Sequence, residues 1–385
     1  MEKFILFNSF NEDLIIQNVI KLEKEFNDDL YNLTLSNLLN HSYNLNLGGD
    51  IFKSYICYLL SNDENPITLL AEKDLKDIDK SLYNIAIKDI SKVIKLFNLD
   101  MGFPKFDKKD SYIEIQNILL SKNENNILDS LLSYYNKNGA GIMNKYKAFK
   151  WSEKTGLIGI ENCDPITFET LVGYERQKGI IMKNTEDFLN GYDANNVLLF
   201  GDSGTGKSSS VKALLNKYHD KGLRLIELNK SDFMDLNNIL SYIRNRGLKF
   251  ILFLDDLSFE EFESEYKHMK ALIEGGVEIR PKNVLIYATS NRRHLIRETW
   301  NDRQGDDIHV SDTRQEKYSL SERFGITLTF TSSTQEEYIN IVKGLVKEKG
   351  IDIDENILRE KAIQWSMVSS GFNGRVAKQF VSSLN

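Results

Sequence analysis

The sequence has little cysteine, no excess of positive charge and no long apolar run. Its two cysteines, Cys57 and Cys163, are too few for a disulfide framework, and two reduced structural thiols are the favoured interpretation. The formal net charge of −7 does not favour a general binder of polyanions but leaves room for a local basic patch. No apolar stretch approaches the roughly 20 residues of a membrane-spanning helix, and the amino terminus carries acidic residues where a signal peptide has an apolar core. We therefore expect a cytoplasmic protein that does not enter a membrane.

Residues 1–145 are expected to form an all-helical domain. The segment is rich in Leu, Ile, Asn and Lys and poor in Gly and Pro. In NEDLIIQNVIKLEKEF and DKSLYNIAIKDISKVIKLF, apolar residues recur every three or four positions, which is the helical period. Such stripes usually pack on each other, and less often they form a groove for a partner. The segment holds no catalytic constellation, so the binding of a protein client is a hypothesis for this domain.

Residues 146–333 alternate between strand and helix patterns, which predicts a parallel sheet covered on both faces. The first part, residues 146–178, is interpreted as a linker into this domain. Five short apolar strands are expected at 197–200, 223–228, 250–254, 284–290 and 326–330, with helices at 207–218, 236–246 and 260–274. Residues 334–385 are expected to form a helical part, with helices near 335–347, 354–368 and from Gly374 onward.

A glycine-rich turn joins the first of these strands to the first helix. Its sequence, GDSGTGKS at 201–208, matches the phosphate-binding pattern G-x-x-x-x-G-K-[ST]. The glycines let backbone N–H groups surround phosphate oxygens, Lys207 reaches the β and γ phosphates, and Ser208 coordinates Mg²⁺. The following helix adds its positive amino end below the phosphates. The residues predicted to bind the phosphates are Asp202, Ser203, Gly204, Thr205, Gly206, Lys207, Ser208 and Ser209.

An acidic pair follows the third strand, in KFILFLDD. Asp255 lies at the strand end and is expected to hold Mg²⁺ through water, next to the Ser208 hydroxyl. Asp256 is the next residue and is expected to face the attacking water as the catalytic base. In isolation this dipeptide would be typical of a solvated turn, and the phosphate-binding motif upstream favours the catalytic interpretation.

A second short motif, NKSD at 229–232, fits the pattern by which GTPases recognise guanine. In GTPases, however, this motif comes after the acidic strand, whereas here it precedes that strand in the chain. The pattern D-x-x-G is also missing at Asp255. Adenine is therefore favoured over guanine as the bound base.

The remaining motifs resemble those of the AAA+ ATPases, in the order that this superfamily shows. LVGYERQK is similar to the segment that lines the adenine pocket, so Leu171, Val172 and Gly173 are assigned to the nucleotide. Asn291, which follows IYATS, is similar to a sensor 1 residue that orients the attacking water. The resemblance implies an α/β P-loop NTPase with a five-stranded parallel sheet, flanking helices and a C-terminal helical lid.

Two arginines complete the resemblance to AAA+ proteins. Arg323, in SLSERFG, stands where many members carry an arginine finger that acts on a neighbouring subunit. Arg375, in GFNGRVAKQF, matches a sensor 2 residue on the lid that touches the γ-phosphate. Asp256, Asn291, Arg323 and Arg375 are accordingly the candidate catalytic residues, and a homo-oligomer formed through Arg323 is implied.

From about Phe149 to the carboxyl terminus, the chain more closely resembles a bacterial AAA+ family catalogued as domain of unknown function eight-one-five. The segments NNVLLFGDSGTGKSSSVKALLNKY, LRLIELNK, FILFLDDLSFE, NVLIYATSNRRHLI and SLSERFG carry this resemblance. It implies an ATPase that uses ATP and Mg²⁺, and it implies no cellular role.

Two features depart from the common AAA+ pattern. Asp256 stands where many members have Glu, and its side chain is one methylene shorter, which leaves the rate of hydrolysis open. No aromatic-apolar-Gly loop follows LRLIEL, where Phe233 and Met234 are the nearest candidates. A threading unfoldase is therefore not supported.

Three functions stay open at this point. The leading one is a Mg²⁺-dependent ATPase that drives a conformational change in a partner, and the second is a nucleotide-gated binding module with little or no hydrolysis. The third is a DNA-associated loader, which the Asp255–Asp256 pair favours, since loader-type AAA+ proteins also use Asp at the second position. Arg292, Arg293, His294 and Arg297 form a basic cluster just after Asn291, which would contact DNA phosphates or the nucleotide of a neighbouring subunit. An ion-pair face within the domain or between subunits is the favoured interpretation of this cluster. The acidic total charge makes DNA the less favoured partner.

Overall fold

A computed structural model of the protein describes residues 2–121, 123–257, 281–291, 323–369 and 371–384. The helix expected at 260–274 and the basic cluster at 292–297 lie outside the described residues. The chain divides into two compact units, Met1–Tyr146 with Arg246–Leu248 and Lys147–Asn245 with Lys249–Asn385. Within the described ranges, no helix is both long enough and apolar enough to cross a bilayer.

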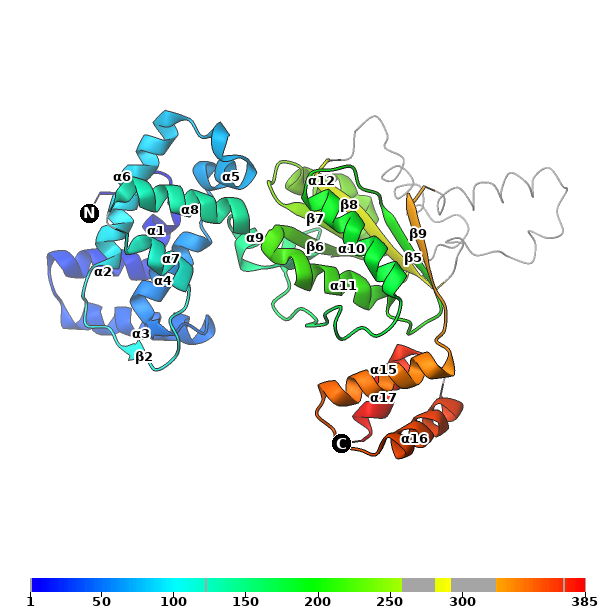
Figure 1. Cartoon of the computed structure of the whole chain (residues 1–385). Coiled ribbons are helices and arrows are strands. Elements are labelled where there is room, and N and C mark those ends of the chain that lie inside the picture. The colour runs from blue at the N-terminus through cyan, green and yellow to red at the C-terminus, as the bar shows by residue number, and fades with distance from the viewer. Residues whose placement is uncertain (1, 122, 258–280, 292–322, 370, 385) are drawn as a thin grey trace. The chain divides into compact units, whose positions relative to one another are not determined.

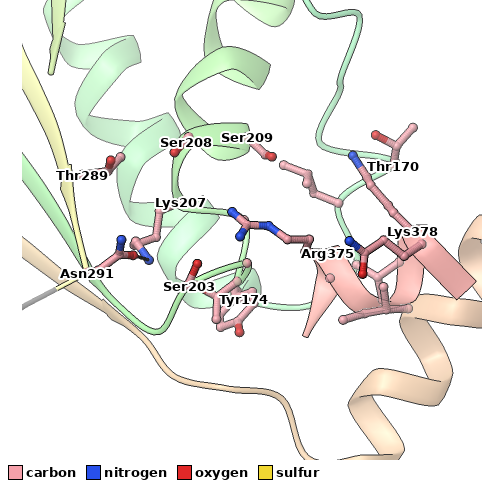
Figure 2. A pocket seen from close by; sticks show the side chains of 18 of the residues that line it. Thr170, Tyr174, Ser203, Lys207, Ser208, Ser209, Thr289, Asn291, Arg375 and Lys378 are labelled. Atoms are coloured by element: carbon pink, nitrogen blue, oxygen red, sulfur yellow. Dashed lines mark hydrogen bonds between the residues drawn. The ribbon is translucent and has the colours of Figure 1, made fainter. Parts of the chain in front are cut away.

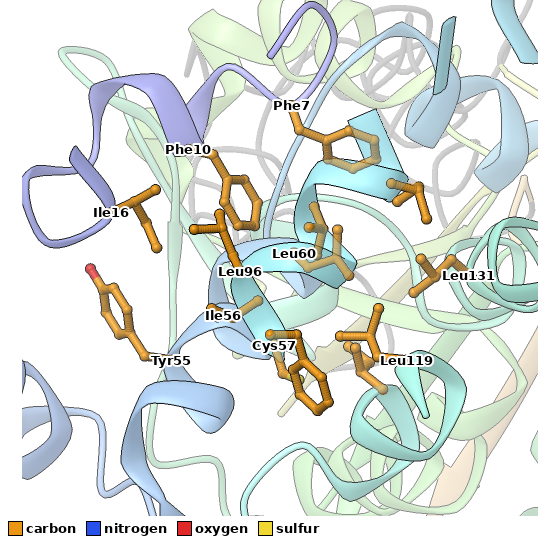
Figure 3. Close-up of a cluster of buried hydrophobic side chains, with 14 of the residues drawn as sticks. Phe7, Phe10, Ile16, Tyr55, Ile56, Cys57, Leu60, Leu96, Leu119 and Leu131 are labelled. Atoms are coloured by element: carbon orange, nitrogen blue, oxygen red, sulfur yellow. The ribbon is translucent and has the colours of Figure 1, made fainter. Parts of the chain in front are cut away.

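The first unit is helical, as its apolar periodicity predicts. Its α-helices are α1 (Ser9–Glu12), α2 (Leu14–Lys24), α3 (Asp28–Asn44), α4 (Ile51–Ser61), α5 (Pro66–Lys73), α6 (Lys80–Phe97), α7 (Ile113–Leu119), α8 (Glu124–Asn138) and α9 (Ile142–Lys145). One short ladder, β1 (Gly49–Asp50) with β2 (Lys105–Phe106), joins two of the connections. Figure 3 shows apolar side chains such as Phe10, Ile56 and Leu131 gathered in the core of this unit.

Asparagine and aspartate residues begin most of these helices. A side-chain oxygen just before the helix accepts a hydrogen bond from a backbone N–H that has no partner within the first turn. The capping residues are Asp13 for α2, Asn27 for α3, Asp50 for α4, Asn65 for α5, Asp79 for α6 and Asn123 for α8. The high asparagine content of the segment therefore has a structural use, which is to set where helices start.

A buried ion pair explains why residues 246–248 belong to the first unit. The Arg246 side chain is 7% exposed, and its Nη2 lies 2.7 Å from Oε2 of Glu72, which is fully buried. Nη1 of Arg246 also lies 2.9 Å from Oε2 of Glu64. Because a buried charge without a partner is costly, the guanidinium holds this short segment among the helices.

A seven-stranded sheet forms the centre of the second unit. Its strands are β3 (Ala148–Ser152), β4 (Gly156–Gly159), β5 (Val197–Gly201), β6 (Leu223–Leu228), β7 (Lys249–Leu254), β8 (Val284–Ser290) and β9 (Ile326–Phe330). Their order across the sheet is β4-β3-β6-β7-β8-β5-β9, and β3–β4 is the antiparallel pair among otherwise parallel neighbours. All five predicted strands form and the predicted α/β class is confirmed, but the sheet has seven strands rather than five, because β3 and β4 extend it.

Residues 146–178 are not a linker, which corrects the interpretation made from the sequence. Two short segments within this range form the hairpin β3–β4, and β3 extends the sheet by pairing in parallel with β6. Phe149 of β3 is fully buried beside Ile226 of β6. The pattern AFKWSEKTGLIG contains as many polar as apolar positions, so pairing with a distant strand, rather than local sequence, makes it part of the sheet.

Two helices cover one face of this sheet. α10 (Glu175–Leu189) and α11 (Lys207–Tyr218) pack their apolar residues on alternate side chains of the strands, for example Ile181 and Leu214 on Leu199 and Phe253. Figure 1 shows both helices lying across the strands. The residues that face the other way, such as Leu252, are also fully buried, which explains why the strands read as continuous apolar runs. α12 (Leu236–Ile243) follows a 3₁₀ turn after β6.

Three helices after β9 form a small cluster with a core of its own. They are α15 (Gln335–Glu348), α16 (Glu355–Val368) and α17 (Gly374–Ser382), and we call them the lid. Tyr338, Val342 and Phe380 meet in the apolar core of the lid. The side chains of Thr334 and Asn373 cap α15 and α17, so both starts are locally determined.

Candidate functional site

A pocket at the carboxyl ends of β5, β7 and β8 gathers most of the residues that the sequence motifs predict. Its volume is about 510 Å³, which lies in the usual range for small-molecule sites. It is lined by Thr170, Leu171, Val172, Tyr174, residues 203–209, Asp255, Asp256, Thr289, Asn291, Ile341, Leu345, Gly374, Arg375, Lys378 and Gln379. In open α/β sheets, ligands bind in crevices outside these strand ends.

The glycine-rich turn begins where β5 ends, and its conformation depends on its glycines. Gly204 and Gly206 have φ angles of 78° and 93°, in the left-handed region that favours glycine. A Cβ atom on Gly201 would lie 1.9 Å from the carbonyl oxygen of Phe330, so a side chain at this position would collide with β9. α11 starts at Lys207, directly after the turn, and its amino end opens on the pocket.

Lys207 is a nearly buried cation at the start of α11, with 6% of its surface exposed. Its Nζ donates to the carbonyl oxygens of Gly201 and Asp202 at 2.8 and 2.6 Å. It also donates to Oδ1 of Asn291 at 3.1 Å. Burial lowers the pKa of the ammonium group, against the opposing effect of nearby carboxylates. Phosphate oxygens, which carry full charge, can replace the carbonyl oxygens as partners of Lys207.

Asp255 is held by two hydroxyl groups at the end of β7. Ser208 Oγ donates to Oδ1 of Asp255 at 2.5 Å, and Thr289 Oγ1 donates to the same oxygen at 2.6 Å. The Ser208 hydroxyl and the Asp255 carboxylate are hard oxygen donors, which suit Mg²⁺. Over the described residues, no group of three His, Cys, Asp or Glu side chains could hold a metal without further ligands. A metal here would therefore depend on phosphate and water oxygens.

Asp256 and Asn291 face each other across the same edge of the sheet. Asn291 Nδ2 donates to Oδ1 of Asp256 at 2.7 Å, so the Asn291 amide connects Lys207 on one side with Asp256 on the other. Asp256 has a φ of 52°, which is uncommon for a residue other than glycine. Its backbone N–H donates to Thr289 Oγ1 at 2.9 Å, which fixes this conformation.

The lid contributes two cations and an apolar wall to the pocket. Figure 2 shows Arg375 extending from α17 toward the phosphate loop and Lys378 extending toward Thr170. The backbone N–H of Arg375 donates to the carbonyl oxygen of Gly204 at 3.3 Å, so the lid and the loop are in contact. Ile341 and Leu345 of α15 provide apolar lining from the lid, and Leu171 and Val172, which precede α10, complete the apolar wall.

Three predicted site residues do not line the pocket within the described part of the chain: Gly173, Asp202 and Arg323. The Asp202 carboxylate points elsewhere, because its Oδ2 accepts hydrogen bonds from the N–H and the Oγ of Ser332, both at 2.7 Å. The sequence could not reveal this, since Ser332 is distant in the chain and follows β9. The other predicted nucleotide, metal and lid residues come together in one place.

The NKSD motif has a structural use and does not line the pocket. Asn229 and Asp232 form a capping box, in which the N–H of Asn229 donates to Oδ2 of Asp232 at 2.8 Å. It begins the short 3₁₀ segment Lys230–Asp235. Within that segment Phe233 is buried, whereas Met234 is 60% exposed. Packing therefore accounts for Phe233 but leaves Met234 at the surface.

Several lining residues were missed by sequence reasoning. Lys378 follows Arg375 by three positions on one helix, so the helical period could have placed both on the same face. Thr289 precedes Asn291 by two positions on a strand, so the strand period could have placed them on one side. Thr170, Ile341 and Leu345 carried no comparable signal, because an apolar or small residue on a helix or loop is too common to single out.

A family model matches the second unit of the chain. The family described as "Protein of unknown function (DUF815)" matches residues 144–385, which is more than half of the sequence. The match spans the whole sheet, the pocket and the lid. It agrees with the resemblance derived from the motifs.

The chain also resembles named proteins over shorter stretches. It is 31% identical over 113 residues to the replication factor C large subunit of Nanoarchaeum equitans, and these residues span 29% of this chain and 26% of that protein. The chain thus spans about a quarter of the length of the curated relative that it matches.

Solved structures resemble the chain at lower identity. The Thermotoga maritima RuvB Holliday junction branch migration motor is 17% identical, with a TM-score of 0.35 over 57% of this chain and 72% of that chain. A chain in the Escherichia coli MS115-1 HORMA:CdnC:Trip13 complex is 15% identical, with a TM-score of 0.38 over 59% of this chain and 93% of that chain.

Proposed function

The chain belongs to the family described as "Protein of unknown function (DUF815)". We propose that it is an AAA+-type ATPase, which binds ATP with Mg²⁺ and hydrolyses it to ADP and phosphate. The free energy of ATP hydrolysis would drive a conformational change in a protein partner. The observation that carries the proposal is the pocket of about 510 Å³ in which the phosphate loop, the acidic pair and the lid meet.

The charges and the apolar wall of the pocket match the two ends of ATP. Three cations, Lys207, Arg375 and Lys378, line it together with the two carboxylates Asp255 and Asp256, so the local balance of these groups is +1. A triphosphate would contact the Lys207 ammonium and the amino end of α11. The base would lie against the apolar side chains of the wall, where burial favours a flat aromatic ring.

The residues near Asp255 fit Mg²⁺ because they offer hard oxygen ligands and leave the other ligand positions to phosphate and water. Ser208 and Asp255 would hold the ion with their oxygens, and the phosphates and water would supply the remaining ligands. Bound there, Mg²⁺ offsets the negative charge of the phosphate oxygens. Thr289 keeps the Asp255 carboxylate in one orientation through its 2.6 Å hydrogen bond.

Asp256 is the proposed base for hydrolysis. Its carboxylate would accept the proton of the attacking water as the water oxygen bonds to the γ-phosphorus, while the bond from the γ-phosphorus to the β–γ bridging oxygen breaks and ADP leaves. Asn291 orients this carboxylate through the 2.7 Å hydrogen bond from Nδ2. When Lys207 moves to the phosphates, its bond to Asn291 Oδ1 is lost, and the Asn291 amide is left free to orient the water together with Asp256.

A second function, a nucleotide-gated binding module, is favoured by one observation. The Asp256 carboxylate already accepts a hydrogen bond from Asn291, and its side chain is shorter than the glutamate common at this position. If Asp256 kept this hydrogen bond, it would accept the proton of the attacking water slowly. Binding of ATP would then serve to hold the lid closed. Single-turnover hydrolysis with protein in excess over ATP separates the two functions, because a module that only gates binding leaves the ATP intact.

Arg323 is proposed to act on the nucleotide of a neighbouring copy of the chain. It does not line the pocket of its own chain within the described residues, and an arginine supplied in trans can raise the rate by about 10³ to 10⁵. Arg323→Ala and Lys207→Ala should each be inactive, and their mixture should recover part of the activity. A mixture that stays inactive would argue that each site works within one chain.

The test of ATP binding is Lys207→Ala, with Lys217→Ala on the same helix as the matched control. Loss of charge-assisted hydrogen bonds to phosphate should weaken ATP binding by about 100-fold or more. Titration calorimetry measures the affinity, and circular dichroism checks that the variant is folded. Equal affinities for the wild type and a folded Lys207→Ala protein would refute the proposed site.

A further inference from the structure

The chain passes from the sheet to the lid through four residues, 331–334, between the end of β9 and the start of α15. Two consecutive residues of this connection bind to different parts of the unit. Ser332 donates to Asp202 of the phosphate loop through its N–H and its Oγ, both at 2.7 Å. The N–H of Ser333 donates instead to the carbonyl oxygen of Phe372, at 3.1 Å, within the lid. The hydrogen-bond partners of the chain therefore change from the phosphate loop to the lid between these two residues, and we call this point the pivot.

Asp202 is fixed from its other side by the phosphate loop and by β9. Its N–H donates to the carbonyl oxygen of Phe330 at 2.9 Å. Its carbonyl oxygen accepts from Lys207 Nζ at 2.6 Å and from Thr205 Oγ1 at 2.8 Å. The hydrogen bonds from Ser332 lower the pKa of the Asp202 carboxyl, so its charged form is favoured. One residue thus contacts the phosphate-binding lysine with its backbone and the pivot with its side chain.

The lid has its own apolar core, so its three helices form one packed body beyond this connection. It carries Arg375 and Lys378 to the pocket, so the angle at the pivot decides where these two cations lie. Val172 packs on the lid, and Gly204 contacts it through the N–H of Arg375. The contact between Asp202 and Ser332 is solvent-exposed, so its loss should loosen the lid without unfolding it.

We propose that Asp202 is a positioning residue: its carboxylate holds Ser332 and thereby sets the angle at which the lid presents Arg375 and Lys378 to the nucleotide. The proposal rests on the proposed function for its link to ATP. Binding of phosphates would draw Lys207 away from the Asp202 carbonyl oxygen. Because the Asp202 side chain holds Ser332, phosphate binding would affect the pivot through Asp202. The sequence motif assigns this position to the nucleotide, whereas the contacts assign its side chain to Ser332, in the connection that leads to the lid.

The experiment measures the lid angle directly in the full-length protein. Spin labels on cysteines at Lys183→Cys of α10 and Arg359→Cys of α16, in a Cys163→Ser background, report the distance between sheet and lid. Asp202→Ala is compared with Asp202→Asn, which keeps an uncharged acceptor, and with Asp193→Ala, an exposed carboxylate near the amino end of β5. ATP affinity and the thermal midpoint are measured on the same variants.

We expect Asp202→Ala to broaden the distance distribution of the nucleotide-free protein and to weaken ATP binding by about threefold to tenfold. Asp202→Asn should fall between Asp202→Ala and the wild type, and Asp193→Ala should match the wild type. An unchanged distribution in Asp202→Ala would overturn the proposal. If the wild type binds no ATP, the proposed function fails, and the distances in the nucleotide-free protein still decide whether Asp202 sets the pivot.

Discussion

The two units use charged side chains in opposite ways. In the helical unit, the Asp89 carboxylate is fully buried and accepts hydrogen bonds from the backbone N–H groups of Ile5 and Leu6 at 2.8 and 2.7 Å. Lys92 Nζ lies 2.9 Å from its other oxygen. These donors are fixed by the fold, so the carboxylate ties the amino-terminal segment to α6.

In the second unit, the charged groups around the pocket have partners that a ligand can replace. Lys207 holds carbonyl oxygens of its own loop, and Asp256 holds the side-chain amide of Asn291. Phosphates, a metal ion and water offer the same kinds of donor and acceptor. Lys207 is also nearly buried, so the kind of partner, rather than the burial of the charge, distinguishes a structural charged group from a candidate functional one.

A change at Asp256 in the pocket should have the greatest effect. Asp256→Asn should lower ATP turnover by about 10² to 10⁴-fold, because the amide cannot accept the proton of the attacking water. ATP affinity and the free energy of unfolding should stay close to those of the wild type, since Asn291 can still bond to the side-chain oxygen. Steady-state hydrolysis, calorimetry and urea unfolding measure the three quantities. Wild-type turnover in Asp256→Asn would show that Asp256 is not the base.

Next in size is a change in the helical unit. Asp89→Ala should lower the free energy of unfolding by about 3 to 5 kcal/mol, because it leaves backbone donors and Lys92 without their buried partner. ATP affinity should not change in the folded protein. Urea unfolding measures the loss, and Asp129→Ala, at an exposed carboxylate that accepts from Tyr83, is the control. A loss of ATP affinity in folded Asp89→Ala protein would contradict the division of roles.

A change at Thr289 should have the least effect. Thr289 is buried, like Asp89 of the helical unit, and it also lines the pocket. It is 1% exposed, and its hydroxyl both donates to Asp255 and accepts from the N–H of Asp256. Thr289→Val keeps the shape and removes both bonds, so turnover should fall by about tenfold and stability by about 1 to 3 kcal/mol. Thr289→Ser keeps the hydroxyl and should retain most of the turnover. If Thr289→Val and Thr289→Ser lose turnover equally, side-chain shape rather than the hydroxyl is what matters.

Much of the second unit could be predicted from the sequence because its signals are local. The strands at Leu223–Leu228, Val284–Ser290 and Ile326–Phe330 have the predicted bounds, since each is a short segment rich in apolar and β-branched residues. Helix Lys207–Tyr218 starts where the glycine-rich turn ends, as predicted. The residues that meet at the pocket could be foreseen for the same reason, because the carboxyl ends of parallel strands share one edge.

Other features could not be predicted, because they depend on contacts between distant segments. The hairpin β3–β4 is a strand pair because β6 offers it a free edge, and nothing in its own sequence requires this. The placement of residues 246–248 follows from the pairing of Arg246 with Glu72, which local pattern cannot indicate.

By itself, the sequence determined the helical period of the first unit, the strand–turn–helix of the phosphate loop and the acidic strand end, because these depend on residues within one or two turns of each other. The tertiary structure alone decided that Asp202 turns from the pocket to Ser332, that Asn291 joins Lys207 to Asp256, and that Lys378 reaches the same pocket from the lid. The reason is that a side chain's direction is set by the partner that satisfies its charge, and here those partners come from other strands and helices.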